Sequence, residues 1–199
     1  MKHLGILLSG RGSNFEAIAE NVRAGKIDAE IAIVISNKPT ARGLERAREL
    51  GITAEYIPSK GLQREEYDRL VVARLKEAGV HLVCLAGFMR LLSSYFVREF
   101  PQKVLNIHPS LLPSFPGLEG QKQALEHGVK HSGCTVHFVD EKLDSGPIIA
   151  QRVVPVHDDD DAHSLSARIL EQEHQAYSEA VKVVLSGNFR IHGRRVIHL

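Results

Sequence analysis

The sequence predicts an α/β fold in which helices flank a doubly wound, mostly parallel sheet, with antiparallel strands toward the C-terminal part. Two observations support this prediction. Over the first hundred residues, runs rich in Ile, Leu and Val alternate with helical patterns, an order typical of parallel strands joined by right-handed crossovers. The strands are near-continuous apolar runs, which is typical of a sheet covered on both faces. No linker or repeat interrupts the chain, so we expect a single domain, 1–199, with two halves that meet at about residue 100.

In the first half each element follows from a local pattern. Short apolar runs predict the strands, and apolar residues spaced three or four apart predict the helices, as with Tyr67, Val71 and Leu75. The expected strands span 4–8, 30–37, 54–57, 80–87 and 104–108, and the expected helices span 14–24, 43–50, 64–78 and 93–100.

The pattern changes in the second half. A loop rich in proline and glycine, 113–120, precedes a helix at 121–127 that Gly128 closes. Two alternating strands, 133–140 and 147–156, are joined by the short polar segment 141–146, so we expect them to be antiparallel. The last predicted element is a long helix at 162–185, capped by Asp161.

The composition is that of an ordinary globular protein. With 199 residues, 43% of them hydrophobic, and a formal net charge of +1, the chain gives no reason to expect a nucleic-acid surface or a membrane patch. No stretch approaches transmembrane length. The two cysteines, Cys84 and Cys134, lie in apolar segments, and we expect buried free thiols in a reducing compartment. We therefore expect a cytoplasmic protein.

The end of the fifth strand carries two polar residues that are candidates for catalysis. Asn106 and His108 occupy alternate positions, so they project to one face, while Ile107 points toward the core. Ligands of open α/β folds bind at the carboxyl edge of the sheet, and a neutral donor beside a histidine suits the holding and protonation of a carbonyl oxygen. The alternative is that His108 only caps a loop.

The turn between the first strand and the first helix contains Gly10, Gly12, Ser13 and Asn14. Glycines let a ligand approach the backbone, and a helix N-terminus offers free N–H groups. The turn resembles a phosphate cradle, but it is neither a P-loop nor a dinucleotide fingerprint. A plain tight turn is the alternative.

Three further features have two interpretations each. Arg64 and Arg90 either pair with a ligand carboxylate or are solvated. The apolar run 88–92 either packs against the next helix or lines a pocket for a flat ring. Asp144 either serves its own Gly/Pro turn or folds over His108, where a carboxylate would fix the ring and favour its charged form.

The four aspartates of 158–161 suggest a metal site, but we favour a solvated loop with one aspartate as helix N-cap. The histidines show no zinc-type spacing such as H-E-x-x-H. We therefore predict no metal.

Several motifs occur together in a characteristic order: SGRGSN, LAGFMRLL, NIHPSLLPSFPG, GCTVHFVDEKLDSGPII and EQEH. With these motifs the chain resembles the folate-dependent formyltransferases over nearly its whole length, and within them the branch that uses glycinamide ribonucleotide. The resemblance implies transfer of the formyl group of 10-formyltetrahydrofolate to the amino group of glycinamide ribonucleotide in purine synthesis. It implies no metal and a monomer or homodimer. The first half would bind the nucleotide, and the second half would supply the folate and catalytic groups.

The resemblance also implies roles for individual residues. Asn106, His108 and Asp144 would form the catalytic trio. Asn106 and protonated His108 would stabilise the oxyanion of a tetrahedral intermediate, and Asp144 would keep His108 charged and help order a water. The implied ribonucleotide ligands are Gly12, Ser13, Asn14 and Glu173. The implied folate ligands are Arg64, Met89, Arg90, Leu91, Leu92, Asn106, Asp140, Glu141, Lys142, Leu143 and Asp144.

Four alternatives remain. A formyltetrahydrofolate hydrolase would share the trio, but a further domain would be expected in it and in a methionyl-tRNA formyltransferase. A sugar-nucleotide formyltransferase would have no reason for the GSN turn, and a nucleotide-binding module would not need the trio. The chain departs from a known family pattern at Glu119, Gly120 and Gln121, where histidines would follow Pro-Gly-Leu. This departure leaves the implied reaction class unchanged and the contacts of that loop open.

Overall fold

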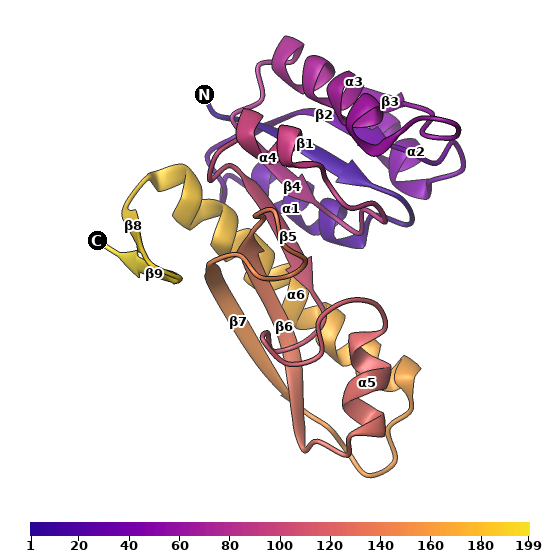
Figure 1. Ribbon diagram of the computed structural model, residues 1–199, viewed down its shortest axis with the longest axis vertical. Coiled ribbons are helices and arrows are strands. Elements are labelled where there is room, and N and C mark those ends of the chain that lie inside the picture. Colours follow the sequence, from indigo (N-terminus) through magenta and orange to yellow (C-terminus); the bar gives the residue numbers. More distant parts are fainter. The chain divides into compact units, whose positions relative to one another are not determined.

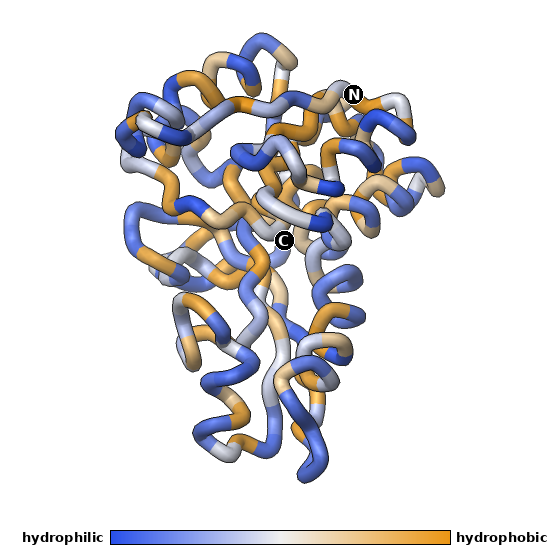
Figure 2. The backbone as a smooth tube through the Cα atoms, turned by 90° about the vertical axis from the view of Figure 1, so that its right-hand side faces the viewer, coloured by the Kyte–Doolittle hydropathy of each residue, from blue (hydrophilic) through white to orange (hydrophobic).

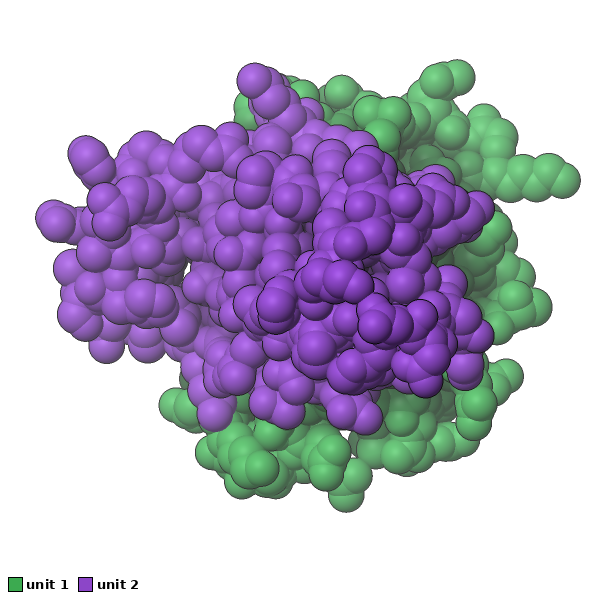
Figure 3. Space-filling view, turned by 90° about the horizontal axis from the view of Figure 1, so that it is seen from below, with its two compact units in different colours: residues 1–106 green, residues 107–199 purple.

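Strands and helices alternate along the first half of the chain in the computed structural model, which describes all 199 residues (Figure 1). The chain divides into two units, Met1–Asn106 and Ile107–Leu199, which Figure 3 colours separately. The boundary lies close to the expected meeting point of the two halves. That the whole chain acts as one domain stays a prediction.

Unit 1 contains the predicted alternation. Its elements are β1 (His3–Leu8), α1 (Ser13–Arg23), β2 (Glu30–Ser36), α2 (Arg42–Glu49), β3 (Ala54–Tyr56), α3 (Arg64–Glu77), β4 (Leu82–Leu85) and α4 (Ser94–Glu99), followed by β5 (Val104–His108), which runs on into unit 2.

The strands of unit 1 are parallel and lie in the order β3-β2-β1-β4-β5. The order reverses between β1 and β4, because the chain first winds outward through β2 and β3 and then crosses back. Helices α1 and α2 contact each other, as do α3 and α4. This agrees with one pair of helices for each of the two directions in which the chain winds. The doubly wound, parallel arrangement is confirmed. Ligands of such sheets bind beyond the carboxyl ends of the strands at this switch point.

Burial explains why these segments form central strands. In β1, Leu4 and the run 6–8 are fully buried, and Val83 and Cys84 of β4 are equally inaccessible. A strand covered on both faces has no polar side to expose, so its sequence is continuously apolar.

Unit 2 has a different architecture. Its elements are α5 (Gly120–Glu126), β6 (His131–Phe138), β7 (Ile148–Pro155), α6 (Ala162–Ser186), β8 (Phe189–His192) and β9 (Arg195–His198). Strands β6 and β7 are antiparallel, as predicted, and α6 packs against both. Asp161 caps α6, because its carboxylate accepts the Ser164 N–H at 2.8 Å.

Strands β8 and β9 were not predicted. They form an antiparallel hairpin around Gly193, which has φ of 62°, and β9 pairs with β7 in parallel at one position. The strands are short and rich in Arg and His, so their alternation of apolar and polar residues is weak. A glycine between two alternating segments was the available signal.

No helix of the structure is long and apolar enough to cross a membrane. In Figure 2 hydrophobic and hydrophilic residues alternate in short runs along the chain. Both cysteines are free and buried, as expected.

Candidate active site

The glycine turn of unit 1 leads directly into α1. Gly12 is the N-cap residue with φ of 80°, a left-handed conformation that suits glycine, and no side chain caps the helix. The Glu16 N–H already bonds to the Gly12 carbonyl at 2.9 Å, whereas the preceding N–H groups have no such intrahelical acceptor. The first turn of α1, at Ser13 and Asn14, therefore presents backbone donors and the positive end of the helix dipole to an anion.

The segment that follows β4 lies beside this turn, because β1 and β4 are neighbouring strands. The Ser9 N–H donates to the Gly87 carbonyl at 3.0 Å, and the Met89 N–H donates to the Ser9 hydroxyl at 2.8 Å. Met89 is 70% exposed and Leu91 is 51% exposed. This segment, 87–92, thus offers apolar side chains to solvent while its backbone is held from β1.

A buried carboxylate holds the other end of segment 87–92. Asp68 is 1% exposed and accepts the Ser93 N–H at 2.6 Å. Burial raises the pKa of Asp68, although its bonds to Ser93 and the charge of Arg90 lower it. The Arg90 guanidinium stacks over the Tyr67 ring, 4.7 Å from its centroid, so the Arg90 side chain packs within unit 1.

The remaining expected residues of unit 1 are placed as follows. Arg64 is the first residue of α3 and is exposed. Asn106 pairs with Leu85 in the register of β5 and β4, so it lies at the same carboxyl edge as segment 87–92. Ile107, the next residue of β5 and the first of unit 2, is only half-buried, so its expected place in the core is only partly correct.

In unit 2, His108 is buried and held at both ring nitrogens. Nε2 lies 2.8 Å from the Phe115 carbonyl oxygen, and Nδ1 lies 3.4 Å from Asp144 Oδ2. A carbonyl oxygen only accepts, so Nε2 carries a hydrogen. Ser110 donates its hydroxyl to the Ser114 carbonyl at 2.6 Å and to the Phe115 carbonyl at 3.2 Å, which fixes the loop that orients the imidazole.

Asp144 is the centre of this cluster. Its Oδ2 accepts the Gly117 N–H at 2.9 Å, and its Oδ1 lies 3.8 Å from Nε2 of His137. The side chains of Asp144, His108 and His137 are 8%, 6% and 3% exposed. A carboxylate between two buried imidazoles, with one bond from a backbone N–H, suits proton transfer and the holding of positive charge.

His137 was not predicted as a site residue. Its Nδ1 donates to the Phe138 carbonyl at 2.8 Å, and burial lowers its pKa despite the nearby carboxylate. The available signal was strand alternation, because Thr135 and His137 share a face of β6. Thr135 donates its hydroxyl to the Ser110 carbonyl at 2.7 Å, so this face also supports the loop that holds His108.

The turn between β6 and β7 is braced by Asp140. Its carboxylate accepts the Ser145 hydroxyl at 2.9 Å and the Lys142 N–H at 3.0 Å. Glu141, Lys142 and Leu143 are exposed. These three residues are therefore accessible to solvent, whereas the Asp144 side chain is buried.

Glu173 lies in α6 and is 8% exposed. Burial and, to a smaller extent, the negative charge of Glu173 raise the pKa of the Cys134 thiol to about 12. Cys134 is thus a protonated, unreactive thiol at neutral pH.

Three of the four aspartates at 158–161 make structural contacts. Arg168 binds Asp160 at 2.7 and 2.9 Å, Lys130 binds Asp158 at 2.8 Å, and Asp161 caps α6. No group of three His, Cys, Asp or Glu side chains is arranged to hold a metal ion.

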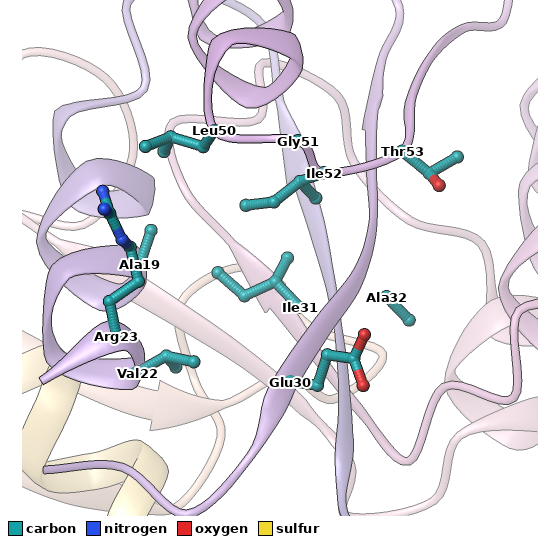
Figure 4. Close-up of a pocket in the computed structure, with 10 residues that line it drawn as sticks. All are labelled: Ala19, Val22, Arg23, Glu30, Ile31, Ala32, Leu50, Gly51, Ile52 and Thr53. Carbon is teal, nitrogen blue, oxygen red and sulfur yellow. The ribbon is translucent and has the colours of Figure 1, made fainter. Parts of the chain in front are cut away.

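A surface pocket of about 270 Å³ lies elsewhere in unit 1, and Figure 4 shows its lining. Its walls come from α1, β2 and the segment after α2, with Arg23 and Glu30 as the charged members. It contains none of the expected site residues.

Comparisons with known proteins identify the family of the chain. The sequence model of the family described as "Formyl transferase" matches residues 2–181. The chain is 51% identical over 189 residues to the trifunctional purine biosynthetic protein adenosine-3 of Drosophila melanogaster, which covers 94% of this chain but only 14% of that longer protein.

Two further relatives match over nearly their whole length. The phosphoribosylglycinamide formyltransferase of Escherichia coli (strain K12) is 44% identical over 188 residues, which is 94% of this chain and 89% of that protein. The crystal structure of glycinamide ribonucleotide transformylase 1 from Symbiobacterium toebii superposes with a TM-score of 0.98 at 49% identity, covering 100% of this chain and 94% of that one. The sequence matches and the fold match agree, and the chain belongs to the formyl transferase family.

Proposed function

We propose that this chain transfers the formyl group of 10-formyltetrahydrofolate to the amino group of glycinamide ribonucleotide, a step of de novo purine synthesis. The observation that carries the proposal is the buried pair of His108 and Asp144, whose Nδ1 and Oδ2 atoms lie 3.4 Å apart. The substrates come from the names of the relatives, whose full-length member from Escherichia coli is 44% identical to this chain.

The ribonucleotide phosphate binds at the start of α1. Gly12, Ser13 and Asn14 supply backbone and side-chain donors there, and the uncapped helix end favours negative charge. Glu173 contacts the ribose or the glycinamide end. Its buried carboxylate suits a hydroxyl or an amine.

The folate binds along backbone groups. Met89, Arg90, Leu91 and Leu92 line the pterin, and this role suits a segment whose backbone is fixed at Met89 and at Ser93. Arg64 meets the glutamate tail as a bidentate cation. The loop 140–144 supplies further contacts to the folate, with Asp140 as its internal brace.

The chemistry is attack of an amine on a formyl carbon. A C–N bond forms, negative charge develops on the formyl oxygen, and the bond to folate N10 then breaks as N10 receives the proton lost by the amine. Asn106 donates to the oxyanion, and the positive charge of protonated His108 stabilises it. No covalent enzyme intermediate is needed, and much of the rate comes from positioning.

Asp144 holds the charge on His108. A hydrogen on Nδ1 faces the carboxylate, whereas a lone pair there would be repelled by it. The Phe115 carbonyl keeps the hydrogen on Nε2. The His108 ring is therefore oriented at both ring nitrogens.

The turnover assay separates this function from its rivals. Purified protein should release tetrahydrofolate only when glycinamide ribonucleotide and 10-formyltetrahydrofolate are both present. Release without an amine acceptor would identify a hydrolase, and activity with another amine alone would identify a different acceptor. Binding of both ligands with no turnover would identify a nucleotide-binding module.

The reaction takes place in the cytoplasm, and the chain acts as a monomer or homodimer. Two buried free thiols, Cys84 and Cys134, support a reducing compartment. Fractionation would test the compartment, and light scattering would test the oligomeric state.

A further inference from the structure

Ser9 connects the two segments of unit 1 to which we assign different substrates. It is the first residue after β1, and the glycine turn to which we assign the ribonucleotide phosphate follows it at Gly10. Its N–H donates to the Gly87 carbonyl at 3.0 Å, and its hydroxyl accepts the Met89 N–H at 2.8 Å. One residue thus contacts segment 87–92 twice at the switch point between β1 and β4.

Asn37 orients the Ser9 hydroxyl. Ser9 Oγ donates to Asn37 Oδ1 at 2.6 Å, and Asn37 is 8% exposed. A hydroxyl has one hydrogen, so this bond leaves only lone pairs to face the Met89 N–H. The Asn37 side chain therefore makes Ser9 an acceptor for segment 87–92.

We propose that Ser9, oriented by Asn37, is a positioning residue that couples the ribonucleotide site to the folate site. The proposal rests on the function proposed above. A phosphate bound at the turn immobilises Ser9, and Ser9 in turn fixes the Met89 N–H and the backbone that faces the pterin.

The exposure of segment 87–92 makes such coupling effective. Met89 is 70% exposed and Leu91 is 51% exposed, so packing holds this segment only in part between its anchors, through Arg90 over the Tyr67 ring. Ordering it costs conformational entropy. When the first ligand orders the segment, the second ligand no longer has to offset the whole of this entropy cost. The second ligand therefore binds more tightly, which is positive coupling without a large structural change.

Calorimetry with a pair of ligands that cannot react tests the proposal. Tetrahydrofolate carries no formyl group, so its affinity can be measured without and with saturating glycinamide ribonucleotide. In the unmodified protein we expect the ribonucleotide to tighten tetrahydrofolate binding about five-fold or more, the lower range of typical coupling between sites. In Ser9→Ala this factor should fall close to one.

Matched variants separate coupling from general damage. Ser186→Ala removes a hydroxyl that also donates to a carbonyl and accepts a backbone N–H, at 2.8 and 3.1 Å, but it lies outside the assigned segments. Ser186→Ala and Ser9→Thr, which keeps the hydroxyl, should both retain the coupling. Asn37→Ala should lose the coupling although Ser9 is still present. This variant tests the proposal independently if Ser9→Ala does not fold.

The outcomes are distinct. Coupling that is lost in Ser9→Ala and Asn37→Ala but retained in Ser9→Thr and Ser186→Ala supports the proposal. Coupling that persists in Ser9→Ala, or that the unmodified protein lacks although it turns over both substrates, overturns it and leaves the proposed function intact. Failure of the unmodified protein to bind either ligand overturns the proposed function as well.

Discussion

His108 and Asp144 are joined through space and through a shared loop. Asp144 Oδ2 lies 3.4 Å from His108 Nδ1 and accepts the N–H of Gly117, while His108 Nε2 bonds to the carbonyl of Phe115, two residues earlier in that loop. The loop 115–117 therefore contacts both members of the pair. Movement of this loop alters the geometry of acid and carboxylate together.

His108→Ala should abolish nearly all turnover and leave tetrahydrofolate binding measurable, because the substitution removes the charge that stabilises the oxyanion. General acid–base groups contribute about 10²–10⁴-fold to rates, so we expect a loss in kcat of at least that order. Steady-state kinetics and calorimetry provide the two measurements. His192→Ala, on an exposed strand, is the control, and near-normal turnover of His108→Ala would refute the mechanism.

Asp144→Asn should fold normally but lose kcat by about 10²-fold or more. Its side-chain oxygen still accepts the Gly117 N–H, whereas the negative charge beside His108 is gone. Asp144→Ala loses both, so it should also expose loop 115–117 to proteolysis. Equal proteolysis of the two variants would contradict a separate structural role for the Gly117 bond.

His137→Asn should make the protein less sensitive to acid. Burial lowers the pKa of His137 below its usual 6.5, so the unfolded chain binds this proton more readily than the folded one. The stability that neutral His137 contributes is complete above pH 6.5 and is lost as the pH falls below that value. Denaturant unfolding at pH 7.5 and 5.5 should show a smaller drop for the variant, and an equal drop would argue against this assignment.

Asp68→Asn should change the pH dependence in the opposite direction. Burial raises the pKa of Asp68 above 3.8, so its contribution to stability is complete below pH 3.8 and is lost as the pH rises through the folded-state pKa. The asparagine oxygen still accepts the Ser93 N–H but does not ionise. Unfolding free energies from pH 4 to 7 should therefore decline less in the variant, and Asp68→Ala should raise KM for the folate by loosening segment 87–92.

Gly146→Ala should destabilise the protein and reduce kcat. A Cβ at Gly146 would lie 1.8 Å from the backbone oxygen of Phe138, so the turn that carries Asp144 must shift. Such overpacking costs about 1–3 kcal/mol. Gly10→Ala, whose Cβ would meet nothing within 4 Å, is the stability control, and a Gly146→Ala variant as stable as Gly10→Ala would contradict the overlap.

Sequence patterns predicted the parts of this molecule in which one physical effect dominates. The continuous apolar strands, the cap at Asp161 and the antiparallel pair β6 and β7 follow from burial and short-range geometry. The hairpin β8–β9 did not, because its polar strands pair with little burial. Within the site, strand position indicated His108, but its contact with Asp144 requires the 35 residues between them to fold back. Only the family resemblance favoured that contact over a local role for Asp144 in its own turn.

The acceptor for His108 Nε2 is a backbone carbonyl, and this has an evolutionary consequence. Every amino acid at position 115 supplies the same oxygen, so the orientation of the imidazole survives changes of the Phe115 side chain. The main restriction is conformational, because φ of 54° at Phe115 disfavours β-branched residues. The side chain at position 115 can thus change while the backbone contact with His108 stays the same, and a comparison of side chains alone would overlook this contact.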